Sequence, residues 1–102
     1  MKKIFFVTLL VVIVCSPGLN AAARYWTGAA DNNWSNTNNW STTSGGTGGA
    51  SVPGSGDVAN FDANGLVNCT LDATVNVAGL TVTSGYTMTI TQSTNTITIG
   101  TS

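Results

Sequence analysis

Three short triplets decide the fold class of this chain: LTV at residues 80–82, MTI at 88–90 and ITI at 97–99. In each triplet a threonine separates two apolar residues. Adjacent side chains of an extended strand point to opposite faces, so the two apolar side chains share one face and the threonine lies on the other. Turn-forming Ser-Gly and Ser-Thr-Asn sequences lie between the triplets. The alternation and the regular spacing predict a series of short β-strands.

The same alternation extends upstream to residue 58. Apolar residues recur at alternate positions in VANF at 58–61, VNCTL at 67–71 and VNV at 75–77. The helix former Glu is absent from the chain, and beyond residue 23 there is no Lys and a single Gln. No helix is therefore predicted.

Two architectures fit strands at this spacing. One is an antiparallel β-sandwich, in which consecutive strands pair; the other is a β-solenoid, in which short strands stack on those of the next turn. Strands of three residues, outward threonines and a lack of charge favour parallel stacking, because like charges in register would repel. We expect an all-β fold, a short right-handed parallel β-solenoid (β-helix), with the antiparallel β-sandwich as the alternative.

The first 23 residues have the pattern of a cleavable signal peptide. Lys2 and Lys3 precede an apolar run at 4–14, and three alanines at 21–23 supply a small-residue cleavage pattern. The run has 11 residues, whereas a membrane-spanning helix needs roughly 20. We expect export and cleavage before Arg24, giving a mature chain that is secreted (extracellular) or on the bacterial outer cell surface, without membrane insertion.

The mature segment is nearly uncharged. Removing 23 of the 102 residues leaves 79, in which one arginine stands against four aspartates, for a net charge of −3. This balance argues against binding to nucleic acid or to anionic lipid, which need clustered basic residues. Cys69 is the one cysteine left after cleavage, so no internal disulfide can form, and its apolar neighbours predict a buried core residue.

The mature segment divides into three zones. Residues 24–41 are rich in Trp and Asn and contain a short repeat, NNWS at 32–35 and again at 38–41. Asn pairs favour turns, so each predicted turn is followed by a tryptophan. Residues 42–57 are rich in Gly, Ser and Thr and predict a loop, and residues 58–102 carry the predicted strands.

The order of these motifs resembles the N-terminal start of large bacterial surface proteins of the autotransporter-like or adhesin-like kind. The resemblance rests on YWTG at 25–28, on the two NWS sequences, on VPGSGD at 52–57 and on FD at 61–62. In such proteins the body is a repetitive parallel β-helix. The resemblance implies that the Trp/Asn segment caps the first coil, that the strands after residue 58 are the first rungs, and that the chain is part of a longer protein.

Trp26, Trp34 and Trp40 are the candidate site residues. Beside many Asn side chains, their indole faces could stack on sugar rings while the amides bind hydroxyl groups, which would make a glycan-binding platform. The alternative, which we favour, is that the indoles cover apolar area at the end of the β-core.

Catalysis has few candidate residues in this sequence. The chain has no His and no Glu, and Asp57 and Asp62 form the one carboxylate pair, the minimal requirement for glycoside hydrolysis. With loop carbonyls the same two aspartates could hold a cation, or they could simply cap turns. We expect no catalytic residue, no cofactor and no metal ligand, and hence no enzyme.

The predicted function is that of a structural or adhesive segment of a secreted or cell-surface protein. The alternatives are a small carbohydrate-binding module that uses the three tryptophans, and the non-catalytic lead-in of a polysaccharide-degrading enzyme. The predicted partners are an extracellular glycan or a surface protein. An uncovered C-terminal edge strand at residues 96–99 also predicts self-association.

Overall fold

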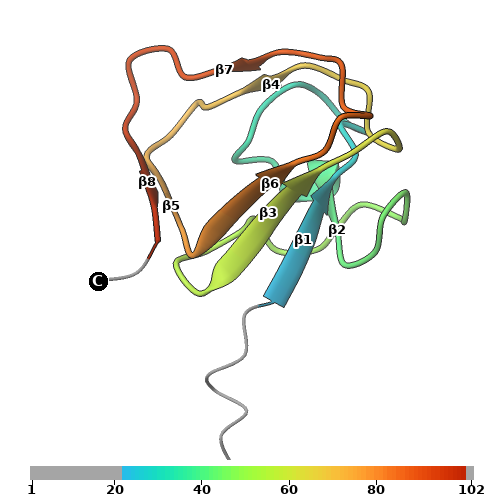
Figure 1. Ribbon diagram of the computed structural model, residues 1–102, viewed down its shortest axis with the longest axis horizontal. Coiled ribbons are helices and arrows are strands. Elements are labelled where there is room, and N and C mark those ends of the chain that lie inside the picture. The colour runs from blue at the N-terminus through green and yellow to red at the C-terminus, as the bar shows by residue number, and fades with distance from the viewer. Residues whose placement is uncertain (1–21, 101–102) are drawn as a thin grey trace, which may run out of the picture.

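The computed structural model describes residues 22–100, and in this part of the chain the fold is all-β, as predicted (Figure 1). The predicted signal peptide lies outside the described residues, except that Ala22 and Ala23 begin the first strand. The elements in chain order are β1 (Ala22–Trp26), the 3-10 turn η3 (Thr37–Asn39), β2 (Trp40–Ser41), β3 (Asp57–Phe61), β4 (Cys69–Thr70), β5 (Val75–Val77), β6 (Gly79–Val82), β7 (Ile90–Thr91) and β8 (Ile97–Ile99).

The strands form three small sheets on different sides of one core (Figure 1). The largest has the order β2-β1-β3-β6 and is mixed, because β2 pairs antiparallel with β1 whereas β1, β3 and β6 are parallel. The other two are the parallel pairs β4-β7 and β5-β8. No helix among residues 22–100 is long and apolar enough to cross a membrane.

The strand register repeats at a nearly constant interval. Val58 pairs with Gly79 and Cys69 with Ile90, each 21 positions further along the chain, and Val75 pairs with Ile97 at 22 positions. The chain therefore returns to each side of the fold after one circuit. We call residues 57–78 the middle layer, residues 79–100 the C-terminal layer and residues 22–56 the N-terminal layer.

This pairing differs from that of the antiparallel alternative. An antiparallel sandwich built from hairpins pairs strands that are consecutive in the sequence. Here β3 pairs with β6, β4 with β7 and β5 with β8, each across two intervening strands. Among the described residues, β1 and β2 form the one antiparallel pair.

The middle layer supplies most of the core. Alternation within β3 points Ala59 and Phe61 inward, while the neighbouring Val58 and Asn60 are partly exposed. The inward positions expected at 69, 71, 75 and 77 are buried, which confirms those assignments, whereas Val67, expected inward in the same stretch, is partly exposed. The triplet expected at 88–90 is different: β7 begins only at Ile90, and the side chain of Met88 is exposed.

Residues 42–56 contain no strand, in agreement with the loop expected there, although the last predicted loop residue, Asp57, is the first residue of β3. The segment folds back on β1 and β2. The amide of Ala50 donates to the carbonyl of Trp40 at 3.0 Å, and the Arg24 guanidinium donates to the carbonyl and hydroxyl oxygens of Ser51. Gly48 is required at the closest approach, because a Cβ there would lie 1.9 Å from the carbonyl oxygen of Asn38.

Candidate functional site: the tryptophan cap and the open end

The three tryptophans form one aromatic cluster inside the N-terminal layer. Trp26 comes from the end of β1, Trp34 from the turn after the bridge between Asn33 and Thr70, and Trp40 from β2. The ring centroids of Trp26 and Trp40 are 5.2 Å apart, and those of Trp34 and Trp40 are 4.7 Å apart, both edge to face. Such contacts are favourable beyond the area that the rings bury.

Phe61 and Tyr86 extend this cluster through the core. The Phe61 ring lies 5.7–6.0 Å from all three indoles and 5.1 Å from the ring of Tyr86. Phe61 belongs to the middle layer and Tyr86 to the C-terminal layer, so one aromatic column connects all three layers. We call Trp26, Trp34, Trp40 and the polar residues bonded around them the tryptophan cap.

The indole N–H groups of Trp26 and Trp40 form hydrogen bonds within the protein. Trp26 Nε1 donates to the carbonyl of Val67 at 2.9 Å, and Trp40 Nε1 donates to the carbonyl of Trp34 at 2.7 Å. The exposed fractions of Trp26, Trp34 and Trp40 are 1, 3 and 0%. A sugar platform requires an uncovered indole face, and this arrangement offers none; the structure therefore favours the packing role of the three residues.

Asn39 is the central polar residue of the cap, and its side chain is fully buried. Its Oδ1 accepts from the amides of Ala30 at 2.8 Å and Asp31 at 3.0 Å. Its Nδ2 donates to Asp31 Oδ1 at 2.7 Å and to the carbonyl of Asn33 at 2.8 Å. The amide thus makes two acceptor and two donor bonds, the full set available to an asparagine, and fixes the loop that carries Trp34.

Sequence reasoning missed this role because the two NNWS copies look alike. Asn33 and Asn39 occupy the same place in the repeat, yet Asn33 is exposed and Asn39 is buried. The difference comes from what surrounds them. The 3-10 turn that ends at Asn39 directs its side chain back toward the loop at residues 30–33, and no local pattern reveals that contact.

Two aspartates hold turns of the cap. The carboxylate of Asp31 accepts from the amide of Asn33 and from the side chains of Asn39 and Asn36, and these bonds lower its pKa. Asp72 accepts from the amide of Ser35 at 2.9 Å and from its hydroxyl. Desolvation raises the pKa of Asp72, but the bonds from Ser35 outweigh it and the net direction is downward. The Asp72–Ser35 pair ties the middle layer to the N-terminal layer.

The carboxylate pair considered for catalysis or cation binding is not brought together. Asp57 begins β3 and Asp62 lies just beyond its end, so their Cα atoms are about 16 Å apart in an extended strand. Glycosidase carboxyl groups lie about 5–9.5 Å apart. Asp57 accepts from the amide of Gly54 at 2.7 Å, and Asp62 from Ser44 Oγ at 2.6 Å. Each caps a turn of its own.

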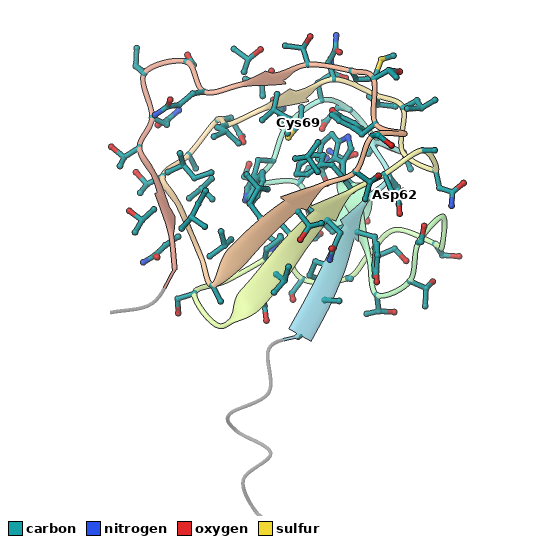
Figure 2. The ribbon with its side chains drawn as sticks, in the orientation of Figure 1. Asp62 and Cys69 are labelled. Atoms are coloured by element: carbon teal, nitrogen blue, oxygen red, sulfur yellow. The ribbon has the colours of Figure 1, made fainter. Side chains whose placement is uncertain are left out.

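Cys69 is a buried core residue, as predicted. It belongs to β4, whereas Asp62 lies just beyond the end of β3 (Figure 2). Desolvation, together with the charge of Asp72, raises the pKa of its thiol to about 12. A thiol of this kind stays protonated and is a poor nucleophile or metal ligand. Residues 22–100 contain no group of three or more His, Cys, Asp or Glu side chains placed to hold a metal ion.

The opposite end of the fold is open. Its β6, β7 and β8 each pair with a middle-layer strand on one side, and among the described residues no strand pairs with their other side. Their inward residues lie above buried middle-layer residues in strict register: Leu80 on Ala59, Val82 on Phe61, Ile90 on Cys69, Ile97 on Val75 and Ile99 on Val77. All five lower residues are buried, but none of the five upper residues is. We call these five upper residues and the free strand edges the open end.

The sequence contained a signal for this stacking of strands. Apolar residues at 59, 61, 67 and 69 recur 21 positions later at 80, 82, 88 and 90. Reading the triplets alone, without this longer offset, predicts alternation but does not show which strands stack on one another.

Comparison with protein-family models, with curated proteins and with solved structures finds no match to this chain. The autotransporter-like or adhesin-like resemblance therefore stays a prediction from the sequence, and the functional conclusion rests on the geometry of the cap and the open end.

Proposed function

We propose that this chain is the capped first part of a right-handed parallel β-solenoid that serves a structural or adhesive, non-catalytic role in an exported or cell-surface protein. The observation that carries the proposal is the register, which places three pairs of parallel strands 21, 21 and 22 residues apart on three sides of one core. A solenoid is defined by such a constant advance per turn. Strand–crossover–strand connections of this parallel kind are right-handed in about 98% of cases, which gives the proposed hand.

The N-terminal layer has the features expected of a solenoid cap. A stack of parallel strands must end in an edge, and β2 covers the last part of the β1 edge, where it pairs antiparallel with Tyr25 and Trp26. The three indoles fill the core within this layer, where the apolar interior of the first coil would otherwise meet water. Repeat proteins need terminal caps of this kind for solubility.

The outward surface supports a structural or adhesive role rather than a chemical one. The stacked outward pairs are Asn60 with Thr81, Thr70 with Thr91 and Asn76 with Thr98. All are uncharged amides or hydroxyls, so stacking them brings no like charges together, and they can form hydrogen bonds to a surface. The aspartates that accept hydrogen bonds are engaged in turns, so they are not free to act on a substrate.

Export is supported by the sequence pattern of residues 1–23, and the composition of residues 24–102 bears on the partners. A chain that lacks lysine after residue 23 and has few other charges has no electrostatic attraction to nucleic acid or to anionic lipid. Expression of the full chain in a bacterial host is expected to yield a processed protein outside the cytoplasm. Full-length material retained in the cytoplasm would contradict export.

A designed cysteine pair tests the stacked register directly. Thr70 and Thr91 are in-register neighbours on the outside of β4 and β7, and adjacent strands are about 4.8 Å apart, within disulfide reach. In a Cys69→Ala background, the pair Thr70→Cys and Thr91→Cys should form an intramolecular disulfide on mild oxidation. The matched control, Thr70→Cys with Thr98→Cys on β8, should not.

The outcome separates the two architectures. Cross-linking of the stacked pair alone supports parallel coils. A folded protein in which the control pair cross-links as readily, or in which neither pair does, refutes the solenoid.

A further inference from the structure

We propose that the outer face of the sheet formed by β1, β3 and β6 binds an extended, uncharged polysaccharide. The inference rests on the proposed function, a layered surface protein with an adhesive role, and adds a ligand class and a site to it. The site is a straight row of three outward side chains, one from each layer: Tyr25, Asn60 and Thr81. We call these three residues the outer row.

The outer row lies on the side of the sheet that faces away from the core. Trp26 and Phe61, the next residues along β1 and β3, are buried in the core, so Tyr25 and Asn60 point outward. Tyr25 and Asn60 are partly exposed, and Thr81 is exposed. Neighbouring strands lie about 4.8 Å apart, so the row spans about 10 Å across the sheet. This length exceeds a single sugar ring and fits a chain of sugars.

Tyr25 supplies the one partly exposed aromatic ring among residues 22–100. The five other aromatic side chains in this part of the chain form the buried aromatic column. A pyranose ring presents a face of C–H groups, and the face of an aromatic side chain stacks on it. Tyrosine suits such a contact at a wet surface, because its ring is apolar and its hydroxyl stays in water. The stacking role considered for the tryptophans is therefore assigned to Tyr25.

The outer row also carries polar atoms that the protein itself does not use. Asn60 Nδ2 donates to the carbonyls of Arg24 at 3.3 Å and Val58 at 3.2 Å, and these bonds hold the amide in place. Within residues 22–100, Asn60 Oδ1 and the hydroxyl groups of Tyr25 and Thr81 form no hydrogen bond. Such groups accept from and donate to the hydroxyl groups of a sugar.

A flat strip of small residues lies beside the outer row. Ala23 pairs with Val58, and Val58 with Gly79, so these three residues form the adjacent outward set across the same strands. Their short side chains leave the face flat, which suits a straight ribbon of β-linked sugars better than a coiled chain. They also supply none of the large apolar or aromatic anchors on which protein–protein contacts depend.

The lack of charge on this face selects a neutral ligand. Arg24 is the one basic residue among residues 22–100, and it donates to Ser51 and to the carbonyl of Ala23. Asp62, just beyond the end of β3, accepts from Ser44 Oγ. Acidic polymers are bound by clustered basic residues, and the outer face has none. The ligand class is therefore an uncharged polysaccharide.

Further coils of the proposed solenoid would lengthen this face and leave it uncovered. A strand of the next coil pairs with β6 in the plane of the sheet, so its outward residue extends the outer row beyond Thr81. The number of sugars in contact therefore increases with the number of coils.

Affinity electrophoresis of the purified exported chain tests the site. Native gels that contain hydroxyethylcellulose, a soluble and uncharged β-linked glucan, should retard the wild type, whereas gels that contain the anionic polygalacturonate should not. Tyr25→Ala removes the stacking ring and should weaken binding at least about tenfold. Tyr25→Phe keeps the ring and should weaken binding by less than about threefold.

A second pair of variants keeps the test decisive if Tyr25→Ala fails to fold. Thr81→Glu places a charge in the outer row and should also weaken binding about tenfold, because its carboxylate loses water on contact with a neutral sugar. Thr91→Glu is the matched control, since Thr91 is an exposed outward threonine of β7, in a different sheet. Circular dichroism of each variant reports its β-structure.

Nuclear magnetic resonance of the wild type with cellohexaose locates the contact without any substitution. Amide resonances of residues 23–25, 58–60 and 79–81 should shift as cellohexaose is added, while those of β5 and β8 stay in place.

The outcomes separate the inference from the proposed function. A folded wild type that hydroxyethylcellulose does not retard, or that polygalacturonate retards as strongly, overturns the neutral polysaccharide site and leaves the solenoid standing. Equal weakening by Thr81→Glu and Thr91→Glu, or shifts confined to β5 and β8, overturns the outer row as the site. A folded chain whose stacked cysteine pair does not cross-link has no such row, and that result overturns both.

Discussion

Replacing Asn39 by Ala tests whether the tryptophan cap is held by its polar centre. The substitution removes four hydrogen bonds of 2.7–3.0 Å from a side chain with no solvent exposure. A hydrogen bond of this kind contributes about 1 kcal/mol, and the exposed carboxylate of Asp31 regains water, so we expect a loss of about 2–4 kcal/mol. A domain of this length has a free energy of unfolding of about 4–12 kcal/mol. The variant should fold marginally.

Urea denaturation monitored by tryptophan fluorescence measures this loss, because the indoles lie beside Asn39. With a slope of about 1.5 kcal/mol/M, the midpoint should fall by about 1.3–2.7 M. Asn33→Ala is the matched control: it changes the same position of the other NNWS copy, where the side chain is exposed. Its effect should stay within about 0.5 kcal/mol. Equal midpoints for the two variants would refute the buried-amide account of the cap.

Three further predictions concern ionisation, the thiol and the N-terminus. The pKa values of Asp31 and Asp72 are lowered in the folded chain, so their contribution to stability is complete above the ordinary carboxyl pKa and is lost as the pH falls through the folded values. The urea midpoint of the wild type should therefore decrease below about pH 4. The decrease should be less steep in Asp72→Asn. Cys69 should not react with a thiol reagent at pH 8 in the folded chain and should react fully in urea, whereas rapid native labelling would contradict its burial. Ala22 and Ala23 pair with β3, so a chain starting at Arg24 should be about 1–2 kcal/mol less stable than one starting at Ala22, and equal urea midpoints would show that these pairs add nothing.

The local part of the fold was predictable because a strand alternates its side chains with a period of two. That rule alone places Phe61, Cys69, Leu71, Val75 and Val77 inward, and all five are buried. This rule requires no information on which strands pair, because the face of each side chain is assigned from residues two positions away in the sequence.

The pairing was not predictable from the same rule. Whether β3 joins β4 in a hairpin or β6 across a full circuit depends on contacts between residues 21 positions apart. Short apolar–Thr–apolar triplets are compatible with both arrangements, because either one buries the same face. The antiparallel pairing of β2 with β1 was likewise hidden, as two residues are too few to carry a period.

The candidate site, like the fold, was predictable from the sequence only in part. The abundance of Trp and Asn indicated a cap, since large aromatic rings must either be buried or serve as binding surfaces. Which of the two applies to Trp26, Trp34 and Trp40 depends on what covers them, namely Phe61 from the middle layer and the neighbouring indoles. That cover comes from tertiary structure and leaves no mark near the tryptophans in the sequence.

The two ends of the stack solve the same physical problem in opposite ways. Every layered β-structure leaves unpaired backbone groups and apolar inward residues at its ends. At the N-terminal end, β2, the indoles and the amide of Asn39 occupy these positions with residues that continue no alternating pattern. At the C-terminal end, Leu80, Val82 and Ile99 continue the inward pattern without a layer to receive it. An end that repeats the interior pattern is suited to further β-structure, whereas the aromatic cap breaks that pattern, so addition is expected at the C-terminal layer.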